Sequence, residues 1–183
     1  LLACILLAAY LLVYVATPES IDGAAFLSTT VSLVQHGTPD INALGSANET
    51  IGSFGMDGNL YSKKGLGPSL AMLPLVLLAR LLPILPLRAV AMLLNPLVTA
   101  MTGVLLYALL RRMACARRTA LLTALLYGLA TFAIAYTRSL FGEPLAGLLI
   151  LTALGLAWPA EGAPPPRRAL LIGAAIGFTF TIN

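Results

Sequence analysis

The feature that most constrains this chain is a series of apolar segments separated by short arginine-bearing turns. Hydrophobic residues make up 59% of the 183 residues and charged residues only 10%, with a mean hydropathy of +0.93. Soluble domains are about 45–50% apolar and about 25% charged. The composition therefore predicts an all-α integral membrane protein.

The excess of positive charge does not predict a nucleic-acid-binding protein. The net charge is +4 and the isoelectric point is near 9.4, but the basic residues sit mainly at the ends of apolar segments. Basic residues in such positions anchor membrane helices on the cytoplasmic side. No basic stripe interleaved with aromatic residues is present, so we expect membrane lipids and no nucleic acid as partners.

The apolar segments predict a multi-span helical bundle. A spanning helix needs about 20 predominantly apolar residues, and a kink is expected at Asn95-Pro96. Residues 1–16 begin within an apolar run and the last segment is short, so we expect residues 1–183 to be the N-terminal part of a larger transmembrane domain. The predicted spans are residues 1–16, 88–110, 119–136, 144–158 and, in part, 169–183.

A polar segment, residues 17–65, separates the first span from the others and is expected to form an outer loop. Plotted at 100° per residue, residues 24–36 place apolar side chains on one side and polar side chains on the other. This pattern is typical of an amphipathic helix that lies in the membrane interface. Residues 37–61 are rich in Gly, Asn, Asp and Ser and are predicted to be irregular.

The segment 66–82 decides the topology. It is apolar, but Pro68 and Pro74 lie within it and Pro83 and Pro86 follow it. We interpret it as a broken interfacial or re-entrant helix that does not cross the membrane. Residues 22 and 143 then face the same compartment, whereas a crossing would place them on opposite sides.

Counting basic residues leaves a rival topology open. A cytoplasmic N-terminus without a crossing at 66–82 gives six Lys and Arg residues inside and five outside, whereas an outside N-terminus with a crossing gives eight and three. The count favours the rival. We prefer the first arrangement because four prolines disfavour a spanning helix and because a phosphate-binding site would need cations outside.

Two carboxylates are the candidate catalytic groups. Asp22 and Glu143 each precede or begin a predicted helix, and Glu143 is followed by Pro144. A carboxylate there can be a helix cap or a partner of the helix dipole. It can also accept a proton from a hydroxyl group, orient that hydroxyl, or help to hold a cation.

Three cations are candidates for binding a phosphate. Lys63 and Lys64 directly precede the segment 66–82, and Arg138 lies near Glu143. The lysines can instead anchor lipid headgroups, and Arg138 can pair with Glu143. The ammonium group of one of these lysines beside an apolar groove would match the two halves of a polyprenyl phosphate.

The order of these features resembles the GT-C type membrane glycosyltransferases, in the group of the protein O-mannosyltransferases and the lipid A aminoarabinose transferases. A first span is followed by an acidic residue, then by Tyr61-Ser62-Lys63 before an apolar stretch containing Gly and Pro. A span ending in Leu109-Leu110-Arg111-Arg112, a restart at Arg117-Arg118-Thr119-Ala120-Leu121-Leu122 and an acid before Pro144 complete the set. Many relatives have paired acids in the first loop, whereas Gly23 follows Asp22 here.

The resemblance implies an inverting transfer of a sugar from a polyprenyl-phosphate carrier to a hydroxyl group of a lipid, glycan or protein acceptor. It implies that Asp22 is the catalytic base, that Glu143 positions the substrate and that Lys63, with Lys64 less favoured, lies near the carrier phosphate. It also implies a bacterial plasma-membrane protein with an extracytoplasmic site. The sequence identifies no cofactor, and a divalent cation is left open. The alternatives are a transporter or lipid flippase, or a non-catalytic membrane subunit.

Overall fold

The computed structural model describes residues 1–183 except 19, 46–49, 83, 159–163 and 183. The described chain is mostly helical, as predicted, with one short antiparallel hairpin. The helices are α1 (Leu2–Leu12), α2 (Ile21–His36), α3 (Gly67–Leu81), α4 (Leu87–Met92), α5 (Leu94–Arg112), α6 (Arg117–Ala130), α7 (Phe132–Tyr136), α8 (Glu143–Ala157) and α9 (Pro166–Thr179), with a 3₁₀ turn at Asn42–Leu44. The strands are β1 (Gly52–Phe54) and β2 (Leu60–Ser62).

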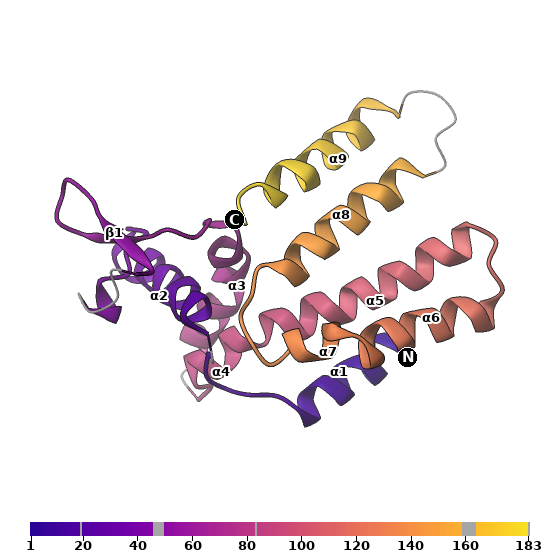
Figure 1. The fold of residues 1–183 in the computed structure, drawn as a ribbon, viewed down its shortest axis with the longest axis horizontal. Helices are drawn as coiled ribbons and strands as arrows, with labels where there is room; N and C mark the ends of the chain where they lie inside the picture. The colour runs from indigo at the N-terminus through magenta and orange to yellow at the C-terminus, as the bar shows by residue number, and fades with distance from the viewer. Residues whose placement is uncertain (19, 46–49, 83, 159–163, 183) are drawn as a thin grey trace.

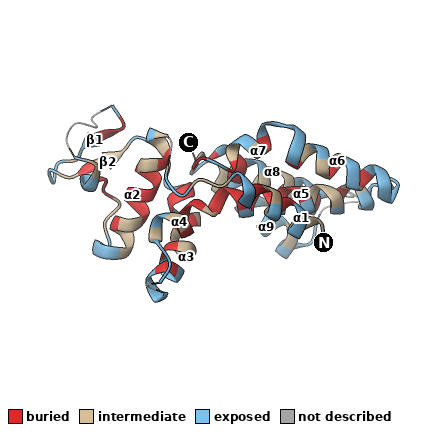
Figure 2. Ribbon diagram, turned by 90° about the horizontal axis from the view of Figure 1, so that it is seen from below, coloured by how far each residue is buried: buried red, intermediate tan, exposed pale blue. Residues whose placement is uncertain are grey.

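Helix α5 is the central element of the longer half of the molecule. It packs against α1, α6 and α8, and α8 in turn packs against α9 (Figure 1). Helices α2 and α3 and the hairpin form a second group beyond the N-terminal end of α5. Many of the buried residues lie in α2, α4 and the start of α5, where the two groups meet, whereas α6 is largely exposed (Figure 2).

The predicted interruption near Asn95-Pro96 is present, one turn earlier than the proline itself. Helix α4 ends at Met92 and α5 begins at Leu94, with Leu93 between them. A proline has no N–H to donate to the carbonyl four residues back, and its ring clashes with that carbonyl. For Pro96 that carbonyl belongs to Met92, which is where the helix stops.

The structure differs from the prediction in two segments, one predicted as a single helix and the other as an irregular loop. Residues 119–136 do not form one helix, because Thr131 separates α6 from α7. Thr131 caps α7 by accepting a hydrogen bond from the Ala133 N–H at 3.1 Å. Residues 37–61 are not wholly irregular, since β1 pairs with β2 from Gly52–Ser62 to Phe54–Leu60. Three-residue strands carry too little alternation to be recognised in a sequence.

Helix α3 corrects the prediction of a broken helix at 66–82. It is continuous through Pro74, and the interruption follows it, before α4 begins at Leu87. Its 15 residues are about 22 Å long, shorter than the roughly 30 Å hydrocarbon core of a bilayer. It packs lengthwise against α2 and α4.

Among the residues that the structure describes, one continuous apolar stretch is long enough to cross a membrane by length and composition. It is Leu87–Arg112, with 26 residues and a mean hydropathy of 1.9. Most of it is buried within the protein, a property shared by core helices of soluble proteins. Helices α1, α3 and α8 are apolar but shorter, so the multi-span bundle stays a prediction from the sequence.

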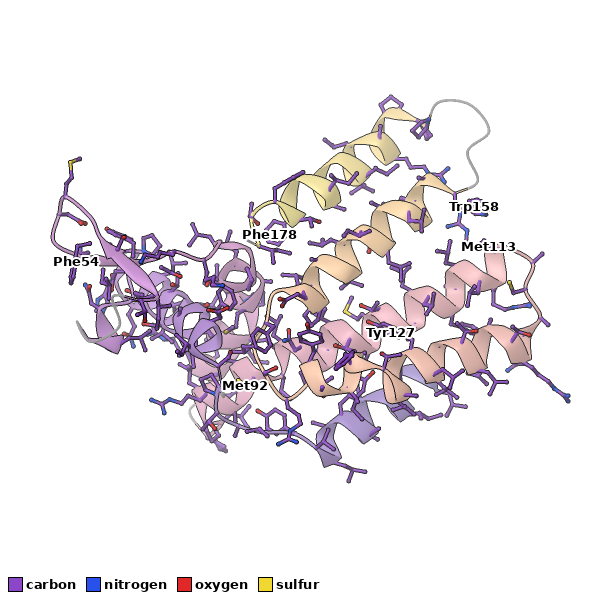
Figure 3. All side chains as sticks on the ribbon, in the orientation of Figure 1. Phe54, Met92, Met113, Tyr127, Trp158 and Phe178 are labelled. Carbon is purple, nitrogen blue, oxygen red and sulfur yellow. The ribbon has the colours of Figure 1, made fainter. Side chains whose placement is uncertain are left out.

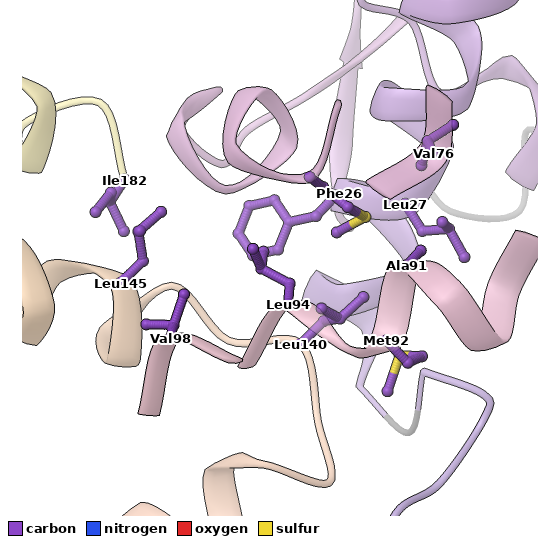
Figure 4. Packing of buried hydrophobic residues seen from close by; sticks show 11 residues of the cluster. Phe26, Leu27, Val76, Ala91, Met92, Leu94, Val98, Leu140, Leu145 and Ile182 are labelled. Atoms are coloured by element: carbon purple, nitrogen blue, oxygen red, sulfur yellow. The ribbon is translucent and has the colours of Figure 1, made fainter. Parts of the chain in front are cut away.

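The main hydrophobic core joins the two halves of the molecule. It brings Phe26 of α2 against Met72 of α3, Leu94 of α5 and Leu145 of α8 (Figure 4). Ile182 lies beside Leu145 in the same cluster. The beginnings of α5 and α8 and the end of α9 are therefore fixed at the same end of the bundle as α2 and α3.

The opposite end of the bundle is rich in arginine. Arg112 donates a hydrogen bond to the Gly155 carbonyl at 3.1 Å, and Arg168 donates one to the Trp158 carbonyl at 2.7 Å. Met113 and Trp158 mark this end, and Met92 lies at the other end (Figure 3). The arginines at this end are Arg111, Arg112, Arg117, Arg118, Arg167 and Arg168.

Helix α5 ends in a Schellman motif that lacks its usual glycine. The Cys115 N–H bonds to the Leu110 carbonyl at 3.1 Å and the Ala114 N–H to the Arg111 carbonyl at 3.2 Å, with Ala114 at φ 61°. A left-handed backbone costs a non-glycine residue about 1–2 kcal/mol. Replacing Ala114 by glycine would remove this cost, but the greater flexibility of glycine in the unfolded chain would offset part of the gain in stability.

We expect Ala114→Gly to raise the free energy of unfolding by about 0.5 to 1 kcal/mol. Ala108→Gly, at an exposed position in the interior of α5, should lower it by about 1 kcal/mol. Denaturant unfolding of the two variants in the same detergent gives the comparison. A loss of stability in Ala114→Gly would contradict the left-handed assignment.

Candidate functional site

Glycines bring three of the predicted site residues to one end of the molecule. A Cβ added to Gly23, beside Asp22, would lie 2.9 Å from Leu140 Cβ. A Cβ added to Gly142, beside Glu143, would lie 2.4 Å from a methyl group of Ile182. The neighbouring side chains lie so close at both points that a residue larger than glycine would force them to move.

Helix α3 begins at the same place. The Gly67 N–H donates to the Thr181 carbonyl at 2.7 Å, and a Cβ added to Gly65 would lie 2.1 Å from that carbonyl oxygen. Pro68 lies near Gly142, at 3.4 Å from the position of an added Cβ. The segments that carry Asp22, Lys64 and Glu143 therefore meet at the end of the bundle opposite the arginines.

Asp22 and Lys64 form an ion pair at this end. The Lys64 Nζ lies 2.8 Å from Asp22 Oδ2, and the two side chains are 44% and 30% exposed. An ion pair this exposed contributes about 0–1 kcal/mol to folding stability. Both groups remain accessible to a ligand, and together they give the site a carboxylate that can accept a proton beside an ammonium group that can bind an anion.

Asp22 is not the cap of α2, which corrects one reading of the sequence. Ser20 is the N-cap and accepts a hydrogen bond from the Gly23 N–H at 3.0 Å. Asp22 lies in the first turn of α2, near the partial positive charge of the helix terminus and beside the Lys64 ammonium group.

The other predicted site residues lie on the same end with exposed side chains. Glu143 begins α8, Arg138 lies in the turn between α7 and α8, and Lys63 directly follows β2. Each is exposed. Of the two lysines, the structure pairs Lys64 with Asp22, although the sequence analysis preferred Lys63.

The turn that carries Arg138 is held by a buried amide. Asn95 is fully buried, and its Nδ2 donates to the Ser139 carbonyl at 2.6 Å, the Phe141 carbonyl at 3.2 Å and the Tyr136 carbonyl at 3.3 Å. Sequence analysis used Asn95 only as part of a kink. Its role is to fix the turn between α7 and α8 to the start of α5.

Sequence reasoning missed a second feature, a cleft of about 1080 Å³ along α2. It lies between α2, the loop that follows it and the start of α4. Its polar wall contains Asp40, which is only 8% exposed. The spacing Thr38-x-Asp40-x-Asn42 after the helix-ending Gly37 is the signal that could have found it, because Asp often hydrogen-bonds to the backbone two residues ahead.

Asp40 joins α2 to this loop through three hydrogen bonds. Ser32 and Thr38 donate their hydroxyl protons to Oδ2 at 2.7 and 2.6 Å, and the Asn42 N–H donates to Oδ1 at 3.1 Å. Burial acts to raise the pKa of Asp40, but these hydrogen bonds to the charged form outweigh it and hold the pKa below its ordinary value of 3.8.

We expect Asp40→Ala to lower the free energy of unfolding by roughly 2 to 4 kcal/mol, because the buried Ser32 hydroxyl and two further donors lose their acceptor. Asp57→Ala removes an exposed carboxylate from the hairpin and serves as the control, with little change expected. Denaturant unfolding at pH 7 measures both. Equal stability of Asp40→Ala and wild type would contradict the role of Asp40.

The difference in unfolding free energy between wild type and Asp40→Ala depends on pH, because the Asp40 carboxylate titrates. Because the folded-state pKa lies below 3.8, the stabilisation is fully present above about pH 4 and is lost as the pH falls through the folded-state value. The gap in unfolding free energy between wild type and Asp40→Ala should therefore be constant from pH 7 to about 5 and narrow below pH 4.

Over the described ranges, no three His, Cys, Asp or Glu side chains come together as metal ligands. His36 lines the cleft as an exposed side chain at the end of α2. Among the described residues, the ion pair and the cleft are the two candidate functional features. On α2 they occupy different faces, since Asp22 lies roughly 130° around the helix from the middle of the cleft-lining residues.

No protein-family model, curated protein sequence or solved structure shows significant similarity to this chain.

Proposed function

We propose that this protein transfers a sugar from a polyprenyl-phosphate carrier to a hydroxyl acceptor at the membrane surface, as the resemblance to GT-C type glycosyltransferases implies. The observation that carries the proposal is the Asp22–Lys64 pair, with Nζ and Oδ2 2.8 Å apart. This reaction needs a base for the acceptor and a cation for the departing phosphate, on opposite faces of the anomeric carbon, so the ion pair opens when the substrate enters between them.

In the proposed step, the acceptor oxygen attacks the anomeric carbon from the face opposite the phosphate. The new carbon–oxygen bond forms as the bond to the phosphate oxygen breaks, and the phosphate leaves with the bonding electrons. Asp22 takes the proton of the acceptor hydroxyl. Lys64 stabilises the charge that grows on the phosphate, and the carrier phosphate competes with Asp22 for the ammonium group.

The distribution of charge supports a membrane setting for this chemistry. Six arginines gather at one end of the bundle, as expected for a cytoplasmic face, and Asp22, Lys64 and Glu143 lie at the other. Large apolar side chains are exposed on the outer helices, where lipid would cover them. They include Leu12, Leu122, Leu126, Ile150, Leu154 and Leu170.

Glu143 and Arg138 are proposed to position the substrate rather than to exchange protons with it. Both are exposed and belong to segments fixed near the ion pair, one by Gly142 and the other by Asn95. Glu143 would accept hydrogen bonds from sugar or acceptor hydroxyls. Arg138 would contact the carrier phosphate.

Binding of a polyprenyl phosphate tests the proposal. With undecaprenyl phosphate in nanodiscs, we expect Lys64→Gln to raise Kd at least about tenfold, since a charge-assisted contact is lost. Lys63→Gln is the matched control and should change Kd less than about threefold. Unchanged binding in Lys64→Gln, or equal losses in both variants, would contradict the assignment of Lys64.

A further inference from the structure

The cleft along α2 takes no part in the proposed transfer. Its volume of about 1080 Å³ is just above the range of about 300–1,000 Å³ for small-molecule sites. Most of its lining comes from α2, the loop 38–44 and the start of α4, and Asn59 adds a residue from the hairpin. Asp22 lies on another face of α2, so a ligand here would not contact the ion pair.

One wall of the cleft is apolar. Leu27 and Val31 lie one turn apart on α2 and face Leu87 of α4, with Pro18 and Pro86 completing this wall. Val31 and Leu87 are only partly buried by the rest of the protein. A hydrocarbon chain is the ligand group that gains most from contact with such a surface.

The rest of the lining offers an anionic carboxylate and a cationic guanidinium group, both of which form hydrogen bonds. Asp40 uses three acceptor positions of its carboxylate on Ser32, Thr38 and Asn42, which leaves acceptor capacity on Oδ1. Arg88 and His36 stand at the exposed margin. The lowered pKa of Asp40 keeps this carboxylate ionised at neutral pH.

Ser28 adds an unusual feature to this wall. It lines the cleft, is only 9% exposed, and its hydroxyl has no hydrogen-bond partner among the residues that the structure describes. A buried hydroxyl without a partner costs about 1–3 kcal/mol. A ligand that supplied a partner would recover part of that cost.

We propose that this cleft binds a neutral amphiphile with a hydroxylated headgroup, of the glycolipid or alkyl glycoside class. Hydroxyl groups can donate to Asp40 and accept from Arg88 at the same time, and the alkyl chain lies against Leu27, Val31 and Leu87. A headgroup with a single charge would be attracted by one of Asp40 and Arg88 and repelled by the other. Hydroxyl groups can form hydrogen bonds with both side chains and are repelled by neither.

Photolabelling tests this proposal. The full chain in phosphatidylcholine nanodiscs is irradiated with a diazirine-bearing octyl glucoside, and labelled peptides are mapped by mass spectrometry. We expect labelling of α2 and the loop 38–44, suppressed at least tenfold by Gln35→Trp or Ala43→Trp, two exposed cleft positions that the larger side chain would block. Ser53→Trp, on the exposed hairpin outside the lining, should label as wild type.

Competition separates the headgroups and the two sites. Excess octyl glucoside should abolish the labelling, whereas octyl phosphate and octylamine at the same concentration should not. Asp22→Asn should label as wild type, so loss of the proposed transfer activity leaves this result unchanged. Labelling that survives both blocking variants would overturn the site, and equal competition by octyl phosphate would overturn the choice of headgroup.

Discussion

Asp22→Asn should reduce sugar transfer at least about 100-fold. General-base catalysis typically contributes 10²- to 10⁴-fold to a rate, and the amide cannot take the acceptor proton although it keeps the size and shape of the carboxylate. The measurement is single-turnover transfer from a labelled polyprenyl-phosphate sugar. Binding of the donor should be unchanged or tighter, because Lys64 no longer shares its charge with a carboxylate.

The control for this variant is Asp57→Asn. Asp57 is an exposed carboxylate of the same outer segment, hydrogen-bonded to Tyr61 at 2.6 Å and outside the ion pair. It should transfer sugar at the wild-type rate. Normal turnover in Asp22→Asn, with membrane insertion intact in both variants, would exclude Asp22 as the base.

Asn95→Leu should lower the free energy of unfolding by about 3 kcal/mol. The substitution keeps the volume nearly constant but removes the Nδ2 donor that serves the carbonyls of Tyr136, Ser139 and Phe141. The Ser139 and Phe141 carbonyls lose their donor, at a cost of about 1–3 kcal/mol each, whereas the Tyr136 carbonyl keeps the Ser139 N–H at 3.3 Å. The gain of apolar burial and the removal of the buried Asn95 Oδ1, which has no hydrogen-bond partner among the described residues, offset part of this loss. Thermal or denaturant unfolding in detergent measures the change.

The matched control lies one turn further along α5. Thr99 is also buried, but its hydroxyl has no hydrogen-bond partner among the described residues. Thr99→Val therefore removes a polar group that contributes no contact, and stability should be unchanged or slightly higher. A large loss in Thr99→Val, or none in Asn95→Leu, would contradict this account of how the turn between α7 and α8 is held.

The sequence predicted the helical character of the chain and several boundaries well. Residues 144–158 correspond closely to α8, and the proline at 96 identified the interruption between α4 and α5. These signals are local, because they depend on apolar composition and on the missing N–H of proline. The break at Thr131 and the short hairpin were not predicted, since a threonine cap and three-residue strands have weak sequence signals.

The candidate site was only partly accessible to sequence reasoning. Asp22 and Lys64 were both singled out by their positions beside apolar helices, but their pairing depends on the path of the 40 or so residues between them. The choice between Lys63 and Lys64 depends on the register of β2, which no local pattern fixes. Asp40 was missed because its partners, Ser32 and Thr38, lie on two different elements.

In the proposed membrane arrangement, residues 22 and 143 face one compartment and the arginine-rich end faces the other. The test is cysteine labelling with a membrane-impermeant maleimide in intact cells, in a background where Cys4 is replaced by alanine and the native Cys115 is kept as the reporter of the arginine-rich end. The account predicts that Asp22→Cys and Glu143→Cys are both modified from outside, while Cys115 reacts only after permeabilisation. Modification of positions 22 and 143 from opposite sides would contradict it.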